Sequence, residues 1–484
     1  MPVAFPLSMS MLYQKDLDVV LQEIVTRWDI PGLAVGIVEG DVIVYAKGFG
    51  VQSLETQAPV TLDSVFSIQS VSKCFVVTAV MQLAERGKLD LDAPLVQYLP
   101  YFRMDDARFQ HITIRQALSH TSGMPDIDEI EYVELVTHPE YDDGSTERFV
   151  RGLSDRKLIA NPGERFSYSN IAYDVLGDLL SKVSGKSFES AMQERILIPS
   201  GMPNSTFMVT DIQANVLAVP HLRSPEMRVN PIYPYHRADA PASFLHTTVV
   251  DMCHWGITCL NRGNYLGQSI LSSAGYDLMW TAVAERGNLR PSLYEEMGLG
   301  WTLGHFKDVK TVSHGGGGFG GTAFLLILPE KNCAAVILCN EESNAHFRAV
   351  QAVADTLIGQ KPQANTVSWM VPISRALAEG GIDAAYARYA EIEARDDEFY
   401  FSKDDILNLS LQLFSTKKID MAIEVLGLNI HVYPEYIESY LEQAKLYMQK
   451  GEIAPAKERL LKALSIEPDN ATTARLLGSY ASLE

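Results

Sequence analysis

The stretch GLAVGIVEGDVIVYAKGFG, residues 32–50, predicts two β-strands joined by a turn at residues 39–41. A second stretch of the same kind, TAFLLILPEKNCAAVILCN, lies at residues 322–340 and turns at residues 329–332. Both stretches are rich in Val, Ile, Leu and Ala, as buried strands are. Because the two hairpins lie at opposite ends of a long segment, we expect one sheet made from both ends of a domain.

The segment between the hairpins carries mostly helical patterns. They extend over residues 72–86, 146–154, 171–184 and 249–262. Helices between two sets of strands predict a sheet that is covered by helices. We expect this domain to end near Gly359, because GQKPQANT at 359–366 has the composition of a linker.

Residues 367–484 differ in character, because they repeat with a period of 34 residues. The matched pairs are Leu407 with Leu441, Leu413 with Tyr447, Ile419 with Ile453, Ala422 with Ala456, and Pro434 with Pro468. This spacing is typical of tetratricopeptide repeats, in which small residues lie where helices cross. A helical pair at about 372–396 fits a degenerate earlier repeat. A generic helical bundle is the alternative.

The bulk composition indicates a globular protein of two or three domains, with 484 residues, 47% of them hydrophobic. The formal net charge is -20 and no Lys/Arg run occurs, so we expect neither nucleic acid nor an acidic membrane as a partner. The five cysteines form no CxxC pair, which predicts buried free thiols in a reducing compartment. The N-terminal residues lack a signal-peptide pattern and no long apolar run follows, so we predict a cytoplasmic location.

The first candidate for chemistry is SIQSVSKCF at residues 67–75, where Ser70 and Lys73 stand three residues apart. No Gly or Pro follows until Gly87, so the spacing predicts a helix that begins at Ser70. Positions i and i+3 share a helix face, so the hydroxyl and the amine would lie side by side. An amine held among apolar neighbours loses its charge more easily and can accept the serine proton. The alternative is an ordinary helix start capped by Ser70.

Two further motifs supply polar groups. PGERFSYSNIAYDVLG at 162–177 offers Tyr168 as an acid or base and Asn170 as a hydrogen-bonding group for the lysine or a substrate. SHGGGGFGGTAFLLIL at 313–328 offers His314 and a run of glycines whose N–H groups can stabilise an oxyanion. The alternative for the first of these motifs is a helix cap beside a packed aromatic ring.

The sequence predicts no cofactor and no metal. Gly315, Gly317 and Gly320 satisfy GxGxxG, but a strand follows them where the dinucleotide fingerprint needs a helix. The histidines show no HExxH-like spacing. The absence of a GxSxG motif disfavours an α/β-hydrolase.

Taken together, SVSK, YSN and HGG in this order resemble the motifs of serine hydrolases related to class C β-lactamases and penicillin-binding proteins. Other stretches fit the same family: IPGLAVGIV (30–38), ITIRQALSHTSGMP (112–125), DMCHW (251–255) and GLGW (298–301). The resemblance covers about residues 15–358. It implies an α/β (α+β) fold over 1–360, with an antiparallel sheet flanked by helices and a helical subdomain at about 90–240, before the all-α repeat domain at 367–484.

The resemblance also implies roles for the matched residues. Ser70 would be the acylated nucleophile and Lys73 its base. Tyr168 would be the second acid or base, supported by Asn170. The N–H groups of Ser70 and Gly317 would form the oxyanion hole.

One motif departs from the classical pattern. His314, Gly315 and Gly316 stand where β-lactamases have a Lys-Thr-Gly strand. A lysine is a cation near pH 7 and a histidine is mostly neutral there, so neutral substrates are favoured over β-lactams.

We therefore predict a serine hydrolase that cleaves small carboxylic esters through an acyl-enzyme on Ser70. The alternatives within this class are a D-aminopeptidase or amide hydrolase and a weak β-lactamase. A binding protein with an inactive hydrolase domain, working through its repeats, is the alternative from another class. For the repeats we expect a cap on the hydrolase domain or a self-association face rather than recognition of a separate protein.

Overall fold

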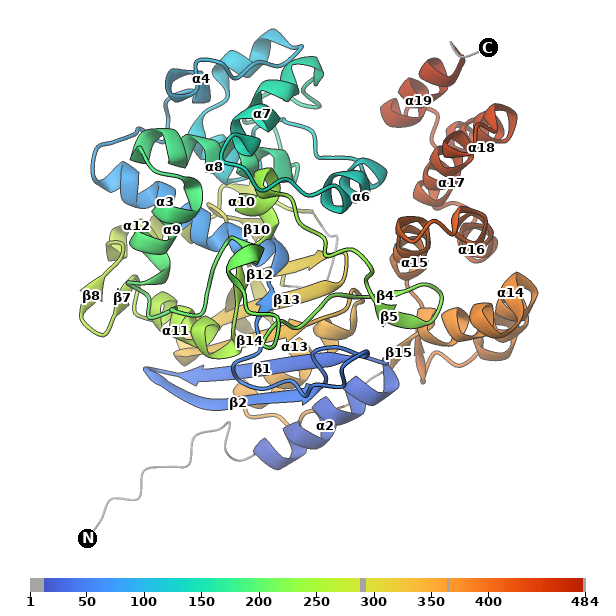
Figure 1. The fold of residues 1–484 in the computed structure, drawn as a ribbon, viewed down its shortest axis with the longest axis horizontal. Helices are drawn as coiled ribbons and strands as arrows, with labels where there is room; N and C mark the ends of the chain where they lie inside the picture. Colours follow the sequence, from blue (N-terminus) through green and yellow to red (C-terminus); the bar gives the residue numbers. More distant parts are fainter. Residues whose placement is uncertain (1–12, 288–292, 364–365, 482–484) are drawn as a thin grey trace.

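The computed structural model describes residues 13–287, 293–363 and 366–481 (Figure 1). Its centre is an eight-stranded sheet in the order β2-β1-β14-β13-β12-β11-β10-β9, with antiparallel neighbours throughout. The strands are β1 (Gly32–Glu39), β2 (Val42–Gly50), β9 (Ala284–Glu285), β10 (Glu296–Met297), β11 (Thr302–Phe306), β12 (Val309–Gly318), β13 (Gly321–Leu328) and β14 (Cys333–Cys339). The predicted antiparallel sheet is confirmed.

Both predicted hairpins form and meet where β1 pairs with β14, near one edge of this sheet. Strand β1 pairs with β2 on one side and with β14 on the other, where Leu33 lies opposite Cys339. The β13–β14 turn closes at Asn332, which takes a left-handed conformation with φ 53°. The two ends of the segment therefore build one sheet, as the apolar runs predict.

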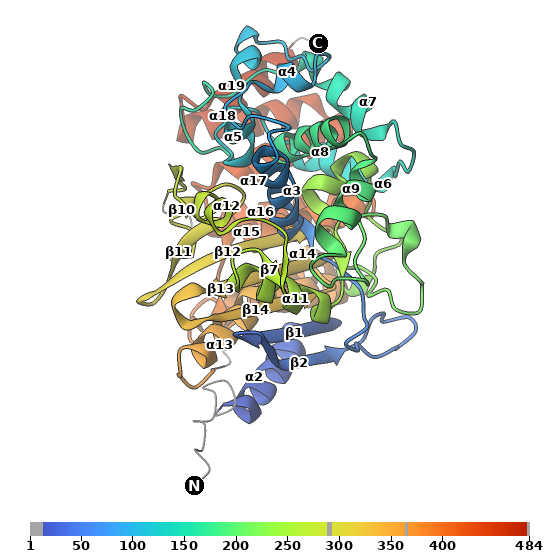
Figure 2. The ribbon, with the colours of Figure 1, turned by 90° about the vertical axis from the view of Figure 1, so that its left-hand side faces the viewer.

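Helices cover both faces of the sheet (Figures 1 and 2). Helices α2 (Gln14–Arg27) and α13 (Ala345–Leu357) pack on one face. Helices α3 (Lys73–Glu85), α8 (Asn170–Ser184) and α11 (Val249–Leu260) belong to the core on the other face. All eleven residues from Lys73 to Leu83 are buried, so α3 runs through the centre of the domain.

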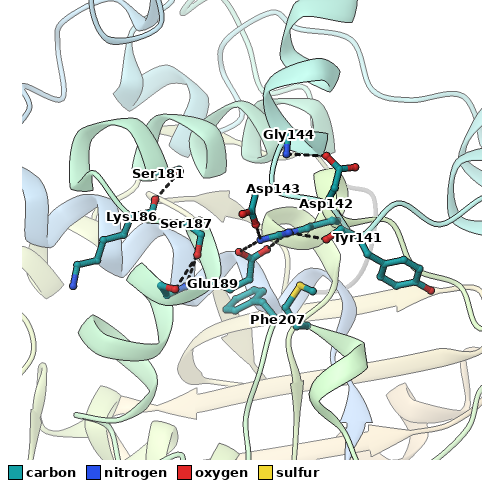
Figure 3. Close-up of polar contacts among 12 residues, drawn as sticks. Tyr141, Asp142, Asp143, Gly144, Ser181, Lys186, Ser187, Glu189 and Phe207 are labelled. Carbon is teal, nitrogen blue, oxygen red and sulfur yellow. Dashed lines mark hydrogen bonds and ion pairs between the residues drawn. The ribbon is translucent and has the colours of Figure 1, made fainter.

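Short helices form a cap above the sheet. They are α4 (Leu95–Tyr98), α5 (Ile114–Leu118), α6 (Glu129–Thr137), α7 (Ser145–Arg151), α9 (Phe188–Met192) and α10 (Ala240–Ser243). On the outer surface of this cap, Asp143 and Glu189 converge beside Tyr141 (Figure 3). Arg237 pairs with Glu189 at 2.7 Å and Asp143 at 2.6 Å, and it donates to the Tyr141 carbonyl oxygen at 2.6 Å. This ion cluster anchors the chain just before α10 returns to the core.

A C-terminal helical region rises beside the cap (Figure 1). Its helices are α14 (Met370–Ile392), α15 (Lys403–Ser415), α16 (Ile419–Val432), α17 (Ile437–Gln449), α18 (Ile453–Ile466) and α19 (Ala471–Ala481). Helices α17 and α18 begin 34 residues after α15 and α16, since 437 − 403 and 453 − 419 both equal 34. The sequence period thus matches successive helical pairs, and the tetratricopeptide assignment stays a prediction. Within α14 the backbone breaks at Gly380 and Gly381.

The helical region is tied to the rest of the chain by polar contacts. Lys445 of α17 pairs with Asp128, the N-cap of α6, and with Glu442 at 2.6 Å. Gln412 of α15 accepts the Arg223 backbone N–H at 2.7 Å. The five cysteines are buried free thiols, as predicted. No helix in the described ranges is long and apolar enough to cross a membrane.

Candidate active site

Ser70 lies in a tight 3₁₀ turn, Gln69–Ser72, and the α-helix begins only at Lys73. The predicted helix start at Ser70 is therefore three residues early. Gln69, at the start of this turn, is a buried non-glycine residue with φ 49°. A left-handed residue cannot continue a right-handed helix and stores strain of about 1–3 kcal/mol. Its side chain donates to Ser67 Oγ at 3.1 Å, which holds the turn that carries Ser70.

Lys73 is fully buried and points at the serine. Its Nζ donates to Ser70 Oγ at 3.0 Å, to Asn170 Oδ1 at 2.7 Å and to the Ala242 carbonyl oxygen at 2.7 Å. These three contacts use all three hydrogens of an ammonium group. A neutral amine in the same position would keep two of the contacts and turn its lone pair toward the serine proton. The geometry is that of a nucleophile beside a base.

Asn170 is oriented by Asp126, which sequence reasoning missed. Asp126 accepts the Asn170 backbone N–H at 2.8 Å and its Nδ2–H at 3.1 Å. With the amide nitrogen held there, the amide oxygen has to face Lys73. Burial raises the pKa of Asp126, whereas its hydrogen bonds from Asn170 oppose this. Asp126 follows SHTSGMP directly, but its partner lies 44 residues away, so only the tertiary structure reveals the contact.

Tyr168 is held by His120. The two rings stack with centroids 4.3 Å apart, and the Ser169 backbone N–H donates to His120 Nδ1 at 3.1 Å. The proton of His120 is therefore on Nε2, and burial lowers the pKa of this histidine well below its ordinary value. Lys73 Nζ lies 5.0 Å from the centre of the Tyr168 ring. Tyr168 thus lies in a fixed place beside the buried lysine.

Strand β12 brings His314 and the glycines to the serine. The Nδ1–H of His314 donates to the Gly315 carbonyl oxygen at 2.7 Å. Burial, with Lys73 nearby, lowers the pKa of His314 to about 3, so the ring is neutral at pH 7. A Cβ on Gly316 would lie 2.4 Å from the Ile68 carbonyl oxygen and 2.9 Å from the Ser70 nitrogen. Only glycine permits this approach of strand and turn.

These groups surround a cavity of about 210 Å³. Its wall includes the guanidinium group of Arg286, which the sequence analysis did not predict. The cavity is lined by Ser70, Tyr168, Arg286, Tyr294, Thr302, His314 and Gly315. Arg286 donates to Thr302 Oγ1 at 2.7 Å. Its Cζ atom lies over the rings of Phe166 and Tyr294, 4.9 Å from each ring centre. Burial lowers the pKa of its guanidinium. Across the described ranges no carboxylate forms an ion pair with Arg286.

A pair of buried carboxyl groups lies behind the lysine. Asp174 of α8 and Asp239, which precedes α10, are neighbours, and each is 1% exposed. Burial raises the pKa of Asp174 well above its ordinary value and the pKa of Asp239 to about 7. Two carboxylates that share a site hold one proton between them.

The structure thus brings most of the predicted site residues together. Ser70, Lys73 and Asn170 are joined by hydrogen bonds, and Tyr168, His314 and Gly315 line the same cavity. Gly316 packs against the serine turn, and Gly317 follows it on the strand. In the described part of the chain, no group of three His, Cys, Asp or Glu side chains is arranged to hold a metal ion.

A larger cavity of about 650 Å³ opens on the outer surface of the cap, around the ion cluster of Figure 3. Its cations already have carboxylate partners. Arg148 pairs with Asp142 at 2.6 Å, and Lys182 pairs with Glu147 at 2.6 Å. Among the described residues that line it, no hydroxyl is hydrogen-bonded to a lysine amine, so the smaller cavity at Ser70 is the candidate active site.

Comparison with known proteins agrees with this geometry. The sequence profile of the beta-lactamase family matches residues 17–360. The chain belongs to the beta-lactamase family. Protein flp of Staphylococcus aureus (strain MW2) is 25% identical over 356 residues, which are 73% of this chain and 68% of that protein. Penicillin-binding protein 4 of Amycolatopsis lactamdurans is 28% identical over 321 residues, 65% of this chain and 82% of that protein.

Solved structures share the fold of this beta-lactamase-family chain. The octameric penicillin-binding protein homologue from Pyrococcus abyssi has a TM-score of 0.65 at 25% identity, over 76% of this chain and 82% of that chain. The class C beta lactamase from Rhodobacter sphaeroides has a TM-score of 0.56 at 21% identity, over 71% of this chain and 98% of that one. The predicted fold and family are confirmed.

Proposed function

We propose that this protein of the beta-lactamase family is a serine hydrolase that cleaves small carboxylic esters through an acyl-enzyme on Ser70. The observation that carries the proposal is the 3.0 Å contact between Lys73 Nζ and Ser70 Oγ, inside a cavity that a small acyl group fits. In the described residues no carboxylate is bonded to Lys73, so no side-chain anion competes with Ser70 for its amine.

In the proposed acylation step, Ser70 Oγ attacks the ester carbonyl carbon while its proton moves to Lys73. The backbone N–H groups of Ser70 and Gly317 stabilise the oxyanion of the tetrahedral intermediate. The C–O bond to the alcohol then breaks, and the departing oxygen takes a proton from the Tyr168 hydroxyl. Asn170 keeps the lysine directed at the serine throughout.

In the proposed deacylation step, a water molecule attacks the acyl-enzyme carbonyl. Tyr168, deprotonated by the first step, accepts the proton of this water. The carboxylic acid leaves when Ser70 Oγ recovers its proton from Lys73. Neutral His314 can accept a hydrogen bond through Nε2 but carries no charge to the substrate.

The decisive experiment is hydrolysis of p-nitrophenyl butyrate by the intact chain and by Ser70→Ala. We expect the variant to lose more than about 1,000-fold in kcat, and mass spectrometry to detect a butyryl adduct on the intact chain only. Ser190→Ala, an exposed serine on α9, is the matched control. Full turnover by Ser70→Ala would overturn the proposal.

Arg286 favours a second candidate, hydrolysis of amides or esters that carry a carboxylate, as a β-lactam does. Arg286, which follows β9, brings a cation to the cavity where His314 brings none, so the preference for neutral substrates does not follow from His314 alone. We expect Arg286→Gln to lower kcat/KM about ten-fold or more for mono-p-nitrophenyl glutarate but not for p-nitrophenyl butyrate. Equal losses on both esters would argue against this role.

A further inference from the structure

A second cavity, of about 500 Å³, lies where the C-terminal region meets the sheet domain. Its walls come from the end of β11, from α13, from residues 293–294 and from β16 (Phe399–Tyr400). The apolar lining residues are Leu293, Tyr294, Phe306, Phe347, Val350 and Tyr400. A mostly apolar cavity of this size is large enough for a small ligand.

One cation on the wall of this cavity lacks a carboxylate partner. Arg348 of α13 lies 4.8 Å from the ring centre of Tyr400 and donates to Gln351 Oε1 at 3.4 Å and to Thr366 Oγ1 at 3.3 Å. Both hydrogen bonds are long. In the described part of the chain, no carboxylate lies within ion-pair distance of Arg348. Burial lowers the pKa of its guanidinium, and the attraction of Asp405 opposes this.

The other cation on the wall is already paired. Lys307 donates to Asp355 Oδ1 at 2.6 Å and also bonds to Gln360. Arg348 differs from Lys307 in this respect, and a half-buried guanidinium without an anion lowers the stability of the folded chain. A bound carboxylate would offset this cost, and a guanidinium fork matches the geometry of a carboxylate.

This cavity is separate from the catalytic cavity, although Tyr294 lines both. The Tyr294 ring packs edge-on against the rings of Phe347 and Phe324, with ring centres 6.2 Å and 6.4 Å apart. Arg286 lies on the catalytic side of this ring and Arg348 lines the other cavity. Each cavity thus combines apolar or aromatic walls with one arginine that has no carboxylate partner among the described residues.

We propose that this second cavity binds a medium-chain carboxylate. The carboxylate lies on the guanidinium of Arg348, and the alkyl chain lies along Phe306, Phe347 and Val350. Tyr400 closes the cavity from the C-terminal region, so a bound ligand contacts both parts of the chain. The inference rests on this cavity alone and does not depend on turnover at Ser70.

The test measures octanoate binding to the full chain by isothermal titration calorimetry. We expect Arg348→Gln to weaken octanoate binding about ten-fold or more, while binding of octan-1-ol, which lacks the carboxylate, changes little. Arg388→Gln is the matched control, because Arg388 lies on α14, pairs with Glu391 and does not line the cavity. Val350→Phe, which fills the cavity with a larger apolar side chain, should weaken both probes.

The two cavities are distinguished by a pair of variants. Octanoate binding should persist in Ser70→Ala and in Arg286→Gln, because neither residue lines the second cavity. Loss of octanoate binding in Arg286→Gln with retention in Arg348→Gln would place the ligand in the catalytic cavity and overturn the inference. So would the absence of binding to the intact chain, or equal binding by the intact chain and a folded Arg348→Gln protein.

Discussion

Gly316→Ala tests whether the fit of β12 against the serine turn is needed for catalysis. The added methyl carbon would stand 2.4 Å from the Ile68 carbonyl oxygen and 2.9 Å from the Ser70 nitrogen. Both are backbone atoms, so no side chain can rotate away. Carbon and oxygen that are not bonded approach to about 3.3 Å. The strand and the turn therefore have to separate by about 0.9 Å.

The expected effect follows from this displacement. Forcing one methyl group into a packed contact costs about 1–3 kcal/mol of stability. A shift of about 1 Å in a catalytic group lowers the rate about 100-fold. We therefore expect Gly316→Ala to fold, to unfold at lower denaturant concentration, and to lose about 100-fold in kcat on p-nitrophenyl butyrate.

Gly317→Ala is the matched control. A Cβ at Gly317 would meet one side-chain atom, of Thr322, at 3.8 Å, which is an ordinary contact. This substitution keeps the backbone N–H, so it should retain most of the activity and the stability. The reasoning is refuted if Gly316→Ala keeps the full rate and denaturation midpoint, or if both alanine variants lose activity equally.

Three further substitutions test neighbouring contacts. Asp126→Asn removes the carboxylate that orients Asn170 and should lower kcat about 10- to 100-fold with little change in KM. The pKa values of Asp174 and Asp239 are raised in the folded chain, so the folded chain holds a proton that the unfolded chain releases. The free energy of unfolding should therefore fall as the pH rises from 5 to 8. Asp174→Asn should reduce this fall, as measured by urea denaturation at several pH values. Lys445→Met leaves Asp128 and Glu442 unpaired and should cost about 1–3 kcal/mol, with faster proteolysis of the C-terminal region.

Each of these has a control and a contradicting result. Asp397→Asn changes an exposed acid and should affect neither kcat nor the pH dependence of stability. Lys450→Met breaks an exposed pair with Asp420 and should cost less than Lys445→Met. An unchanged kcat in Asp126→Asn would contradict the role of Asp126. The explanation for Asp174 fails if Asp174→Asn shows the same fall in stability with pH as the unmodified chain. The explanation for Lys445 fails if Lys445→Met and Lys450→Met unfold at the same denaturant concentration.

Short sequence patterns predicted the features that depend on neighbouring residues, namely the strands of the sheet and the Ser70–Lys73 contact. The apolar runs of β1 and β14 identify central strands, because strands buried on both faces need apolar residues throughout. The i, i+3 spacing brings Ser70 and Lys73 together because the turn and α3 join without a break. The sequence could not give the conformation of Gln69, since a left-handed glutamine is held by tertiary contacts and not by its own preference.

The site residues that were missed are those whose roles depend on distant partners. Asp126 acts on Asn170, and the Ala242 carbonyl oxygen acts on Lys73 across 169 residues. Neither belongs to a short motif. A carbonyl oxygen has no sequence signal at all, because every residue has one.

Arg286 brings a cation to the cavity although position 314 is not a lysine. Position 314 holds a histidine whose buried ring is neutral at pH 7, so strand β12 brings no charge to the cavity. Arg286, next to β9, reaches the same cavity because β9, β10 and β11 fold back beside β12. Its contact with Thr302 Oγ1 fixes the guanidinium at the edge of the site. A motif comparison along β12 finds no lysine, whereas the folded chain places Arg286 at the same cavity. We therefore expect the substrate charge that this site accepts to depend on Arg286 more than on His314.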